Sequence, residues 1–83
     1  MNKTKYVIVN GSAIVFSAAI QHKDMVGHNE KCEGAGFVWF GLRKDETGEP
    51  EIYANCYGDS FSLGISSREE DSAIVTRQIT RGY

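Results

Sequence analysis

The chain has 83 residues and a mass of 9.2 kDa, which suits one domain over residues 1–83 and is too short for a doubly wound sheet or barrel. Hydrophobic residues make up 41% and charged residues 24%, so a disordered chain is excluded, and no apolar run is long enough to cross a membrane. Nine Lys and Arg stand against eleven Asp and Glu, whereas nucleic-acid binders usually carry a strong basic excess. Two cysteines form no disulfide framework, so we expect a soluble cytoplasmic protein.

The N-terminal region contains the clearest structural signal. Residues 6–9 and 12–16 are β-branched runs separated by Asn10-Gly11, which predicts a hairpin with a type I′ turn. Its register pairs Val7 with Ile14 and leaves both faces of the hairpin largely apolar. Such a strand pair is either sandwiched between layers or covered by another copy of the chain, and we expect one face to be buried by a second subunit.

The middle of the chain is predicted to form a short helix, a loop and a strand. Ser17 is a suitable N-cap for a helix over residues 18–26, and Gly27 is a suitable stop. Residues 28–36 are polar with two glycines and predict a loop. Residues 37–42 are rich in aromatic and β-branched side chains and predict a strand.

The C-terminal part predicts two more strands and a helix. Residues 51–57 form a strand, and Gly58-Asp59 turns the chain into an alternating strand over residues 60–65. Ser66 or Ser67 caps the final helix, because each has a Glu three residues later. The apolar stripe of this helix comprises Ile74, Val75, Gln78 and Ile79. The predicted order is β-β-α-β-β-β-α, an α+β domain with an antiparallel sheet of about five strands and two short helices.

Residues 57–68 form the strongest candidate ligand site. They combine a tyrosine, an aspartate, serine hydroxyls and an arginine near a helix start, an arrangement that suits a phosphorylated ligand, while an aromatic ring covers its base. A solvated sheet face with a plain helix cap is the alternative. The predicted ligand-binding residues are Tyr57, Asp59, Ser60, Ser62, Arg68 and Trp39.

Catalysis and metal binding are not expected. Gly58-Asp59-Ser60 is similar to the GDS block of a serine hydrolase family, but that chemistry needs a downstream His, and both histidines lie upstream. A hairpin turn explains these residues better. The residues of metal-ligand type are too widely spaced for a zinc site; they are His22, His28, Cys32 and Cys56. We therefore expect no enzyme activity, metal or cofactor.

One predicted hairpin concentrates the aromatic residues Phe37, Trp39, Phe40, Tyr53 and Tyr57. Two short helices cannot cover both faces of the sheet, so an aromatic face remains for a second copy or a protein partner. The same rings could stack on a nucleobase.

Residues 5–17 and 57–71 resemble small tailed-phage proteins of unassigned function, over about a third of the chain. The resemblance implies an accessory protein in the bacterial host cytoplasm that acts on host defence by binding. Two functions remain open for a homo-oligomer of this kind. One is sequestering a small nucleotide-like ligand, and the other is inhibiting or scaffolding a host protein through the aromatic face.

Overall fold

An N-terminal hairpin begins the fold and has the register that its sequence predicts. In the computed structural model, which describes residues 3–80, β1 (Thr4–Val9) pairs antiparallel with β2 (Ser12–Ser17), and Val7 lies opposite Ile14. Asn10 and Gly11 have φ values of 51° and 80°. Positive φ at both central residues defines the predicted type I′ turn, so this prediction is confirmed.

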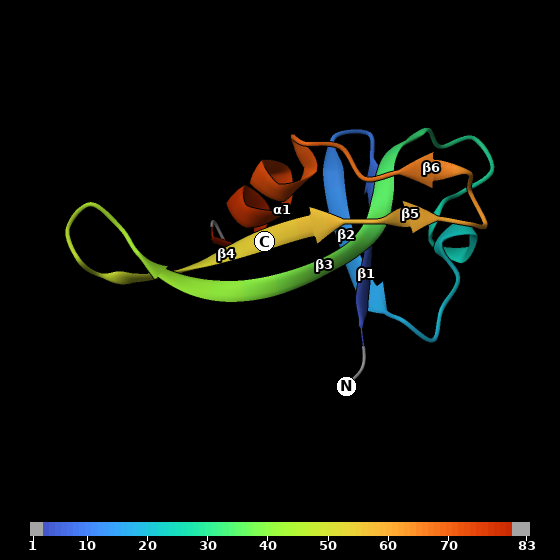
Figure 1. The fold of residues 1–83 in the computed structure, drawn as a ribbon. Helices are drawn as coiled ribbons and strands as arrows, with labels where there is room; N and C mark the ends of the chain where they lie inside the picture. The colour runs from blue at the N-terminus through green and yellow to red at the C-terminus, as the bar shows by residue number, and fades with distance from the viewer. Residues whose placement is uncertain (1–2, 81–83) are drawn as a thin grey trace.

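Four antiparallel strands form the main sheet in the order β2-β1-β3-β4. Strand β3 (Cys32–Lys44) pairs with β1 through its first half and with β4 (Pro50–Tyr57) through its second half. The outer part of the β3–β4 hairpin, residues 39–53, extends away from the body of the molecule (Figure 1). We call this segment the arm.

The remaining elements lie on the two sides of this sheet (Figure 1). Helix α1 (Asp71–Thr80) packs on one face. The single 3₁₀ turn η1 (His22–Met25) and a small sheet of β5 (Asp59–Ser60) and β6 (Ile65–Ser66) lie on the other. The fold is α+β as predicted, but residues 3–80 form a four-stranded sheet, a second two-stranded sheet and one α-helix.

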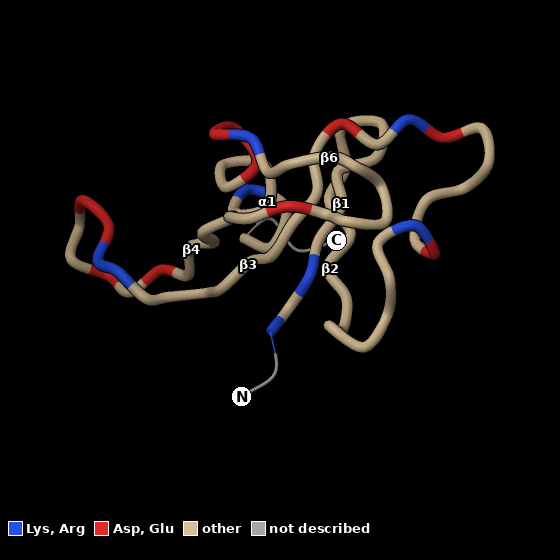
Figure 2. Tube along the Cα trace, turned by 45° about the vertical axis from the view of Figure 1, so that its right-hand side comes forward, with Lys and Arg blue, Asp and Glu red and all other residues tan. Residues whose placement is uncertain are grey.

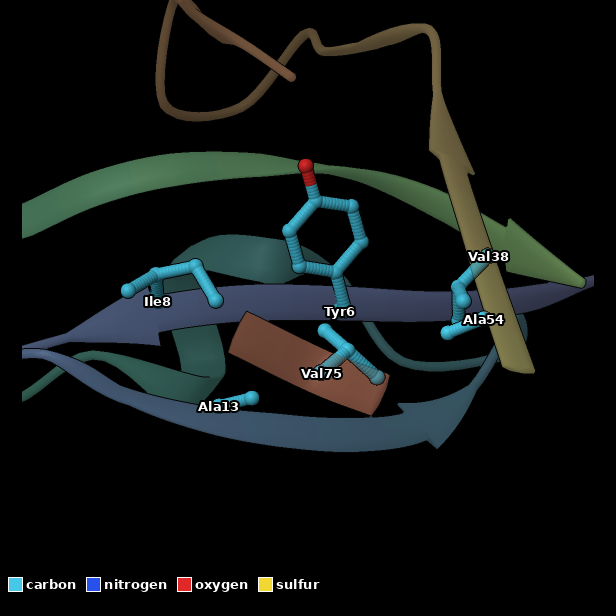
Figure 3. Close-up of a cluster of buried hydrophobic side chains, with 6 residues drawn as sticks. All are labelled: Tyr6, Ile8, Ala13, Val38, Ala54 and Val75. Atoms are coloured by element: carbon cyan, nitrogen blue, oxygen red, sulfur yellow. The ribbon is translucent and has the colours of Figure 1, made fainter. Parts of the chain in front are cut away.

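Each face of the N-terminal hairpin contributes to a separate core. Tyr6, Ile8 and Ala13 pack with Val38, Ala54 and Val75 beneath α1 (Figure 3). On the opposite face, the buried residues are Val7, Val9, Phe16 and Ala35, and side chains from η1, β6 and the preceding turn cover them. Both apolar faces are therefore buried within one chain. The hairpin therefore needs no second subunit to cover it, and self-association of the chain stays a prediction.

Helix α1 also occupies the edge of β4. The backbone N–H groups of Ala54 and Cys56 donate to the hydroxyls of Thr76 and Ser72, each at 2.8 Å. Pro50, at the outer end of the strand, has no N–H. These features leave little of the β4 edge free to pair with another strand.

The same helix reaches the opposite edge of the sheet. The Gln78 side chain accepts a hydrogen bond from the Ala13 N–H at 2.8 Å and donates one to the Ala13 carbonyl at 2.6 Å. One helix thus bonds to both edge strands, β4 and β2, which fixes its position across the curved sheet.

Two predicted elements between residues 18 and 36 were wrong. The helix over residues 18–26 is reduced to η1, because the Ser17 hydroxyl accepts only the Ala19 N–H at 3.1 Å and no continuous apolar stripe follows. The predicted loop over residues 28–36 contains the first five residues of β3. Its glycines are packing positions: a Cβ at Gly34 would lie 2.1 Å from the Asp71 carboxylate, and one at Gly36 would lie 2.5 Å from the Tyr57 carbonyl oxygen.

The predicted strand over residues 60–65 was also wrong. Residues 61–64 form a turn, closed by a 2.9 Å hydrogen bond from the Gly64 N–H to the Ser60 carbonyl. The final helix begins later than predicted, because Ser67 donates its N–H to Gly58 and Ser66 lies in β6. The Asp71 carboxylate accepts a hydrogen bond from the Arg68 N–H at 3.0 Å. This bond satisfies a backbone donor just before the start of α1.

None of the helices within residues 3–80 is long and apolar enough to cross a membrane.

Candidate functional site

A pocket of about 280 Å³ opens where β1, η1 and the turn after β5 meet. It combines charged, hydrogen-bonding and aromatic side chains from segments that are far apart in the sequence. The lining residues are Lys5, Gln21, His22, Phe37, Asp59, Phe61 and Ser62.

The sheet register positions the basic wall of the pocket. Lys5 in β1 lies directly opposite Phe37 in β3, so the two side chains share a face. The Lys5 ammonium donates a 2.9 Å hydrogen bond to the Ile20 carbonyl, which uses one of its three protons. The Lys3 ammonium lies 5.2 Å from the centre of the Phe37 ring. Two cations therefore lie beside one aromatic ring at the pocket.

His22 forms the floor of the pocket and is almost fully buried. Its Nε2 lies 2.7 Å from the Gly36 carbonyl oxygen. Because a carbonyl only accepts, Nε2 carries the proton, and this assigns Nδ1 as the ring nitrogen left for a ligand. Phe16 and Phe37 flank the imidazole edge-on at 5.5 and 6.0 Å and hold it in place.

The turn after β5 supplies one wall of the pocket, with one aromatic and one polar side chain. Phe61 is fully exposed, and it lines both this pocket and an adjoining hollow of about 240 Å³ that it shares with Asp59. The Ser62 hydroxyl accepts the Lys23 N–H at 3.2 Å, which ties the turn to η1. Asp59 is exposed at the same rim. The aromatic ring of Phe61 thus lies between two hollows with a carboxylate at their boundary.

The structure brings some of the predicted site residues together and separates others. Asp59 and Ser62 line the pocket, and Tyr57 lies beside it, stacked on Phe37 with ring centres 5.8 Å apart. Ser60 is only 1% exposed, and its hydroxyl accepts the Leu63 N–H at 3.2 Å. The expected open strand face shared by Ser60 and Ser62 does not exist.

Trp39 lies on the arm and does not line the pocket, although it is two residues from Phe37 on the same face of β3. It is 45% exposed and packs edge-on against Tyr53 with ring centres 5.6 Å apart. Arg43 lies over the same Tyr53 ring, 5.1 Å from its centre. These rings form an aromatic surface on the arm, on the same face of the sheet as Phe37.

Arg68 is held by a buried carboxylate. Its Nη2 and Nε lie 2.7 and 2.9 Å from Asp71 Oδ1, and Asp71 is fully buried. The Tyr6 hydroxyl donates to Asp71 Oδ2 at 2.5 Å. Burial, with this bond to a carboxylate, raises the pKa of Tyr6 well above its usual range. The Arg68 charge is therefore compensated within the fold, and Arg68 does not line the pocket.

Sequence reasoning missed Lys5, Gln21, His22, Phe37 and Phe61 as one site. The sequence carries only one indirect signal, the aromatic residue at 61 between two serines in a polar turn. The other contributions depend on the pairing of β1 with β3 and on η1 folding back over them.

Within residues 3–80, no three His, Cys, Asp or Glu side chains lie close enough together to hold a metal ion. Comparisons with protein-family models, curated proteins and solved structures give no match.

Proposed function

We propose that this chain is a non-enzymatic binding protein that holds a small phosphorylated, nucleotide-like ligand in the pocket between β1, η1 and the turn after β5. The observation that carries the proposal is the presence of a cation, a carboxylate and two aromatic rings around one pocket of about 280 Å³. This volume lies just below the usual range of about 300–1,000 Å³ for ligand pockets, which favours a mononucleotide over a larger cofactor.

Each wall of the pocket matches one part of such a ligand. Lys5, with Lys3 beside it, provides the positive charge for a phosphate. Phe61 and Phe37 provide aromatic surface for a base. The Asp59 carboxylate accepts N–H groups at the base edge, which favours bases that present donors. The resemblance to small tailed-phage proteins supports a bacterial nucleotide signal as the ligand and host defence as the setting.

Thermal denaturation in the presence of mono-, di- and cyclic nucleotides tests this function. A ligand that binds only the folded state raises the melting temperature by mass action. Lys5→Ala should weaken binding about tenfold to a hundredfold, because a charge-assisted hydrogen bond contributes roughly 1.5–3 kcal/mol. Arg77→Ala removes an exposed cation on α1 and is the matched control. The absence of stabilisation by any nucleotide at millimolar concentration would reject the proposal.

The aromatic surface of the arm favours a second candidate function, inhibition or scaffolding of a host protein. Trp39 is 45% exposed and packs against Tyr53, and Trp and Tyr are enriched in protein interfaces. Trp39→Ala should then abolish retention of one defined host protein while nucleotide binding persists. Equal retention by the wild type and by Trp39→Ala would reject this second function.

A further inference from the structure

The pocket beside η1 carries one carboxylate that no cation of the fold compensates. Of the described residues that line the pocket, Asp59 alone is acidic. Its side chain is exposed at the rim, and none of the ion pairs within residues 3–80 involves it. An ionised carboxylate only accepts hydrogen bonds, and its two oxygens can take two parallel N–H groups. Asp59 therefore suits a ligand edge that presents two neighbouring donors.

Ser62 adds a donor close to this carboxylate in the chain. It lies in the turn that follows β5 and lines the same pocket. Its hydroxyl accepts the Lys23 N–H at 3.2 Å, and the Ser60 hydroxyl is 3.4 Å away, too far for a strong bond. The proton of the Ser62 hydroxyl is thus available to a ligand acceptor. One short segment presents two acceptor oxygens and one donor to the pocket.

Phe61 lies between these two polar residues in the chain and supplies a surface for a base. Its side chain is fully exposed and lines the pocket together with Asp59 and Ser62. Aromatic stacking tolerates every base, because every base has a π-face. The polar groups that flank the ring are therefore the ones that distinguish one base from another.

Guanine is the base whose edge matches this set of groups. Its N1–H and N2–H groups are adjacent donors, and the O6 acceptor follows on the same edge. Adenine and cytosine each place a ring-nitrogen acceptor beside a single amino group, so a carboxylate there would face a lone pair. Uracil has one N–H between two carbonyl oxygens, which a carboxylate would repel. Guanine alone among these bases offers a carboxylate two donors.

We propose that the pocket selects guanine nucleotides, with N1–H and N2–H of the base donating to Asp59 and O6 accepting from Ser62. The phosphate then lies at the wall formed by Lys5, and Figure 2 shows basic residues gathered where the chain enters β1. This inference rests on the proposed nucleotide-binding function and adds the identity of the base.

Calorimetric titration of the full chain with GMP, IMP and AMP tests the choice of base. The wild type should bind GMP about tenfold more tightly than AMP, because adenine cannot donate two hydrogen bonds to Asp59 and water competes at the exposed rim. IMP keeps N1–H and O6 but lacks the N2 amino group, so its affinity should lie between those of GMP and AMP.

Two substitutions test the assigned contacts. Asp59→Asn should bring the ratio of GMP affinity to AMP affinity close to one, and this ratio cancels the general effect of removing a negative charge near a phosphate. Ser62→Ala should weaken GMP and IMP to a similar extent and leave AMP unchanged. Asp24→Asn is the matched control, because Asp24 is an exposed carboxylate on η1 that does not line the pocket; it should keep the wild-type ratio.

The outcomes separate this inference from the function on which it rests. AMP that binds as tightly as GMP would overturn the selectivity for guanine and leave nucleotide binding in place. A preference for GMP that persists in Asp59→Asn would overturn the assignment of the base edge to Asp59. No binding of any of the three nucleotides at millimolar concentration would reject the proposed function and this inference together.

Discussion

Asp71 holds the start of α1 against the sheet, and its replacement by Asn is the most informative change to the fold. Asn keeps the volume of the side chain and removes its charge. Asp71 is fully buried and accepts hydrogen bonds from the Tyr6 hydroxyl, the Arg68 N–H and Arg68 Nε. The amide can accept through only one oxygen, and its NH₂ group must face a former donor.

The expected loss follows from these contacts. Hydrogen bonds to charged groups contribute roughly 1.5–3 kcal/mol each, and at least one is lost while Arg68 is left without its counter-charge. Arg68 retains 30% of its side-chain exposure and stays partly hydrated, so we expect about 3 kcal/mol for Asp71→Asn. In a domain of this size, that lowers the melting temperature by about 12–24 °C.

Calorimetry of three proteins tests this reasoning. Tyr6→Phe is the control, because it removes one donor and leaves the Arg68–Asp71 pair intact; it should cost about 1.5–2 kcal/mol, the lower part of the range for a bond to a charged group. An Asp71→Asn protein that melts within about 4 °C of the wild type would refute the role of this buried cluster. A Tyr6→Phe protein less stable than Asp71→Asn would show that packing around the ring, and not the carboxylate, is decisive.

Three further predictions concern the same core. Gly34→Ala should cost about 1–3 kcal/mol in urea denaturation, because its Cβ would lie 2.1 Å from Asp71 Oδ2; an unchanged midpoint would contradict this contact. Burial raises the pKa of Cys56 to about 11 and that of Tyr6 above its usual range, so the native protein keeps protons that the unfolded chain releases. These two shifts should make stability fall as the pH rises above about 8, less steeply in Tyr6→Phe, and a flat profile to pH 11 would be inconsistent with them. Gln78→Ala should cost about 1–2 kcal/mol and speed hydrogen exchange at the Ala13 amide; unchanged exchange would show that Gln78 does not hold this edge.

Local signals predicted the parts of the fold that local chemistry decides. Asn10-Gly11 set both the turn and the register, so the two faces of the first hairpin were predicted correctly. The stripe of α1 was also predicted, and Val75 is its buried centre. Both features depend on residues within a few positions of one another.

Long-range packing decided what the sequence could not indicate. Gly34 and Gly36 are typical of a loop by composition, yet β3 uses them where the Asp71 carboxylate and the Tyr57 carbonyl approach the strand. The residues around Arg68 had the composition of an anion-binding site. The anion that Arg68 contacts is instead the buried carboxylate of Asp71, at the start of α1.

The pocket was missed for a related reason. Lys5, His22 and Phe61 come from three separate segments, and only the pairing of β1 with β3 and the folding of η1 bring them together. No spacing pattern within any one segment records this arrangement. Asp59 and Ser62 were predicted as site residues because both lie in the polar segment 57–68; the structure places Asp59 in β5 and Ser62 in the turn after it.

The central claim is that the pocket beside η1 binds a phosphorylated ligand, and a ¹H–¹⁵N NMR titration with a purine nucleoside monophosphate tests it most directly. The account predicts saturable shift changes at Lys5, Gln21, Phe61 and Ser62, with little change in α1 or at the tip of the arm. Lys5→Ala should shift the titration to higher concentrations without changing which amides respond. No shift changes at millimolar nucleotide, or changes confined to the arm, would contradict the claim.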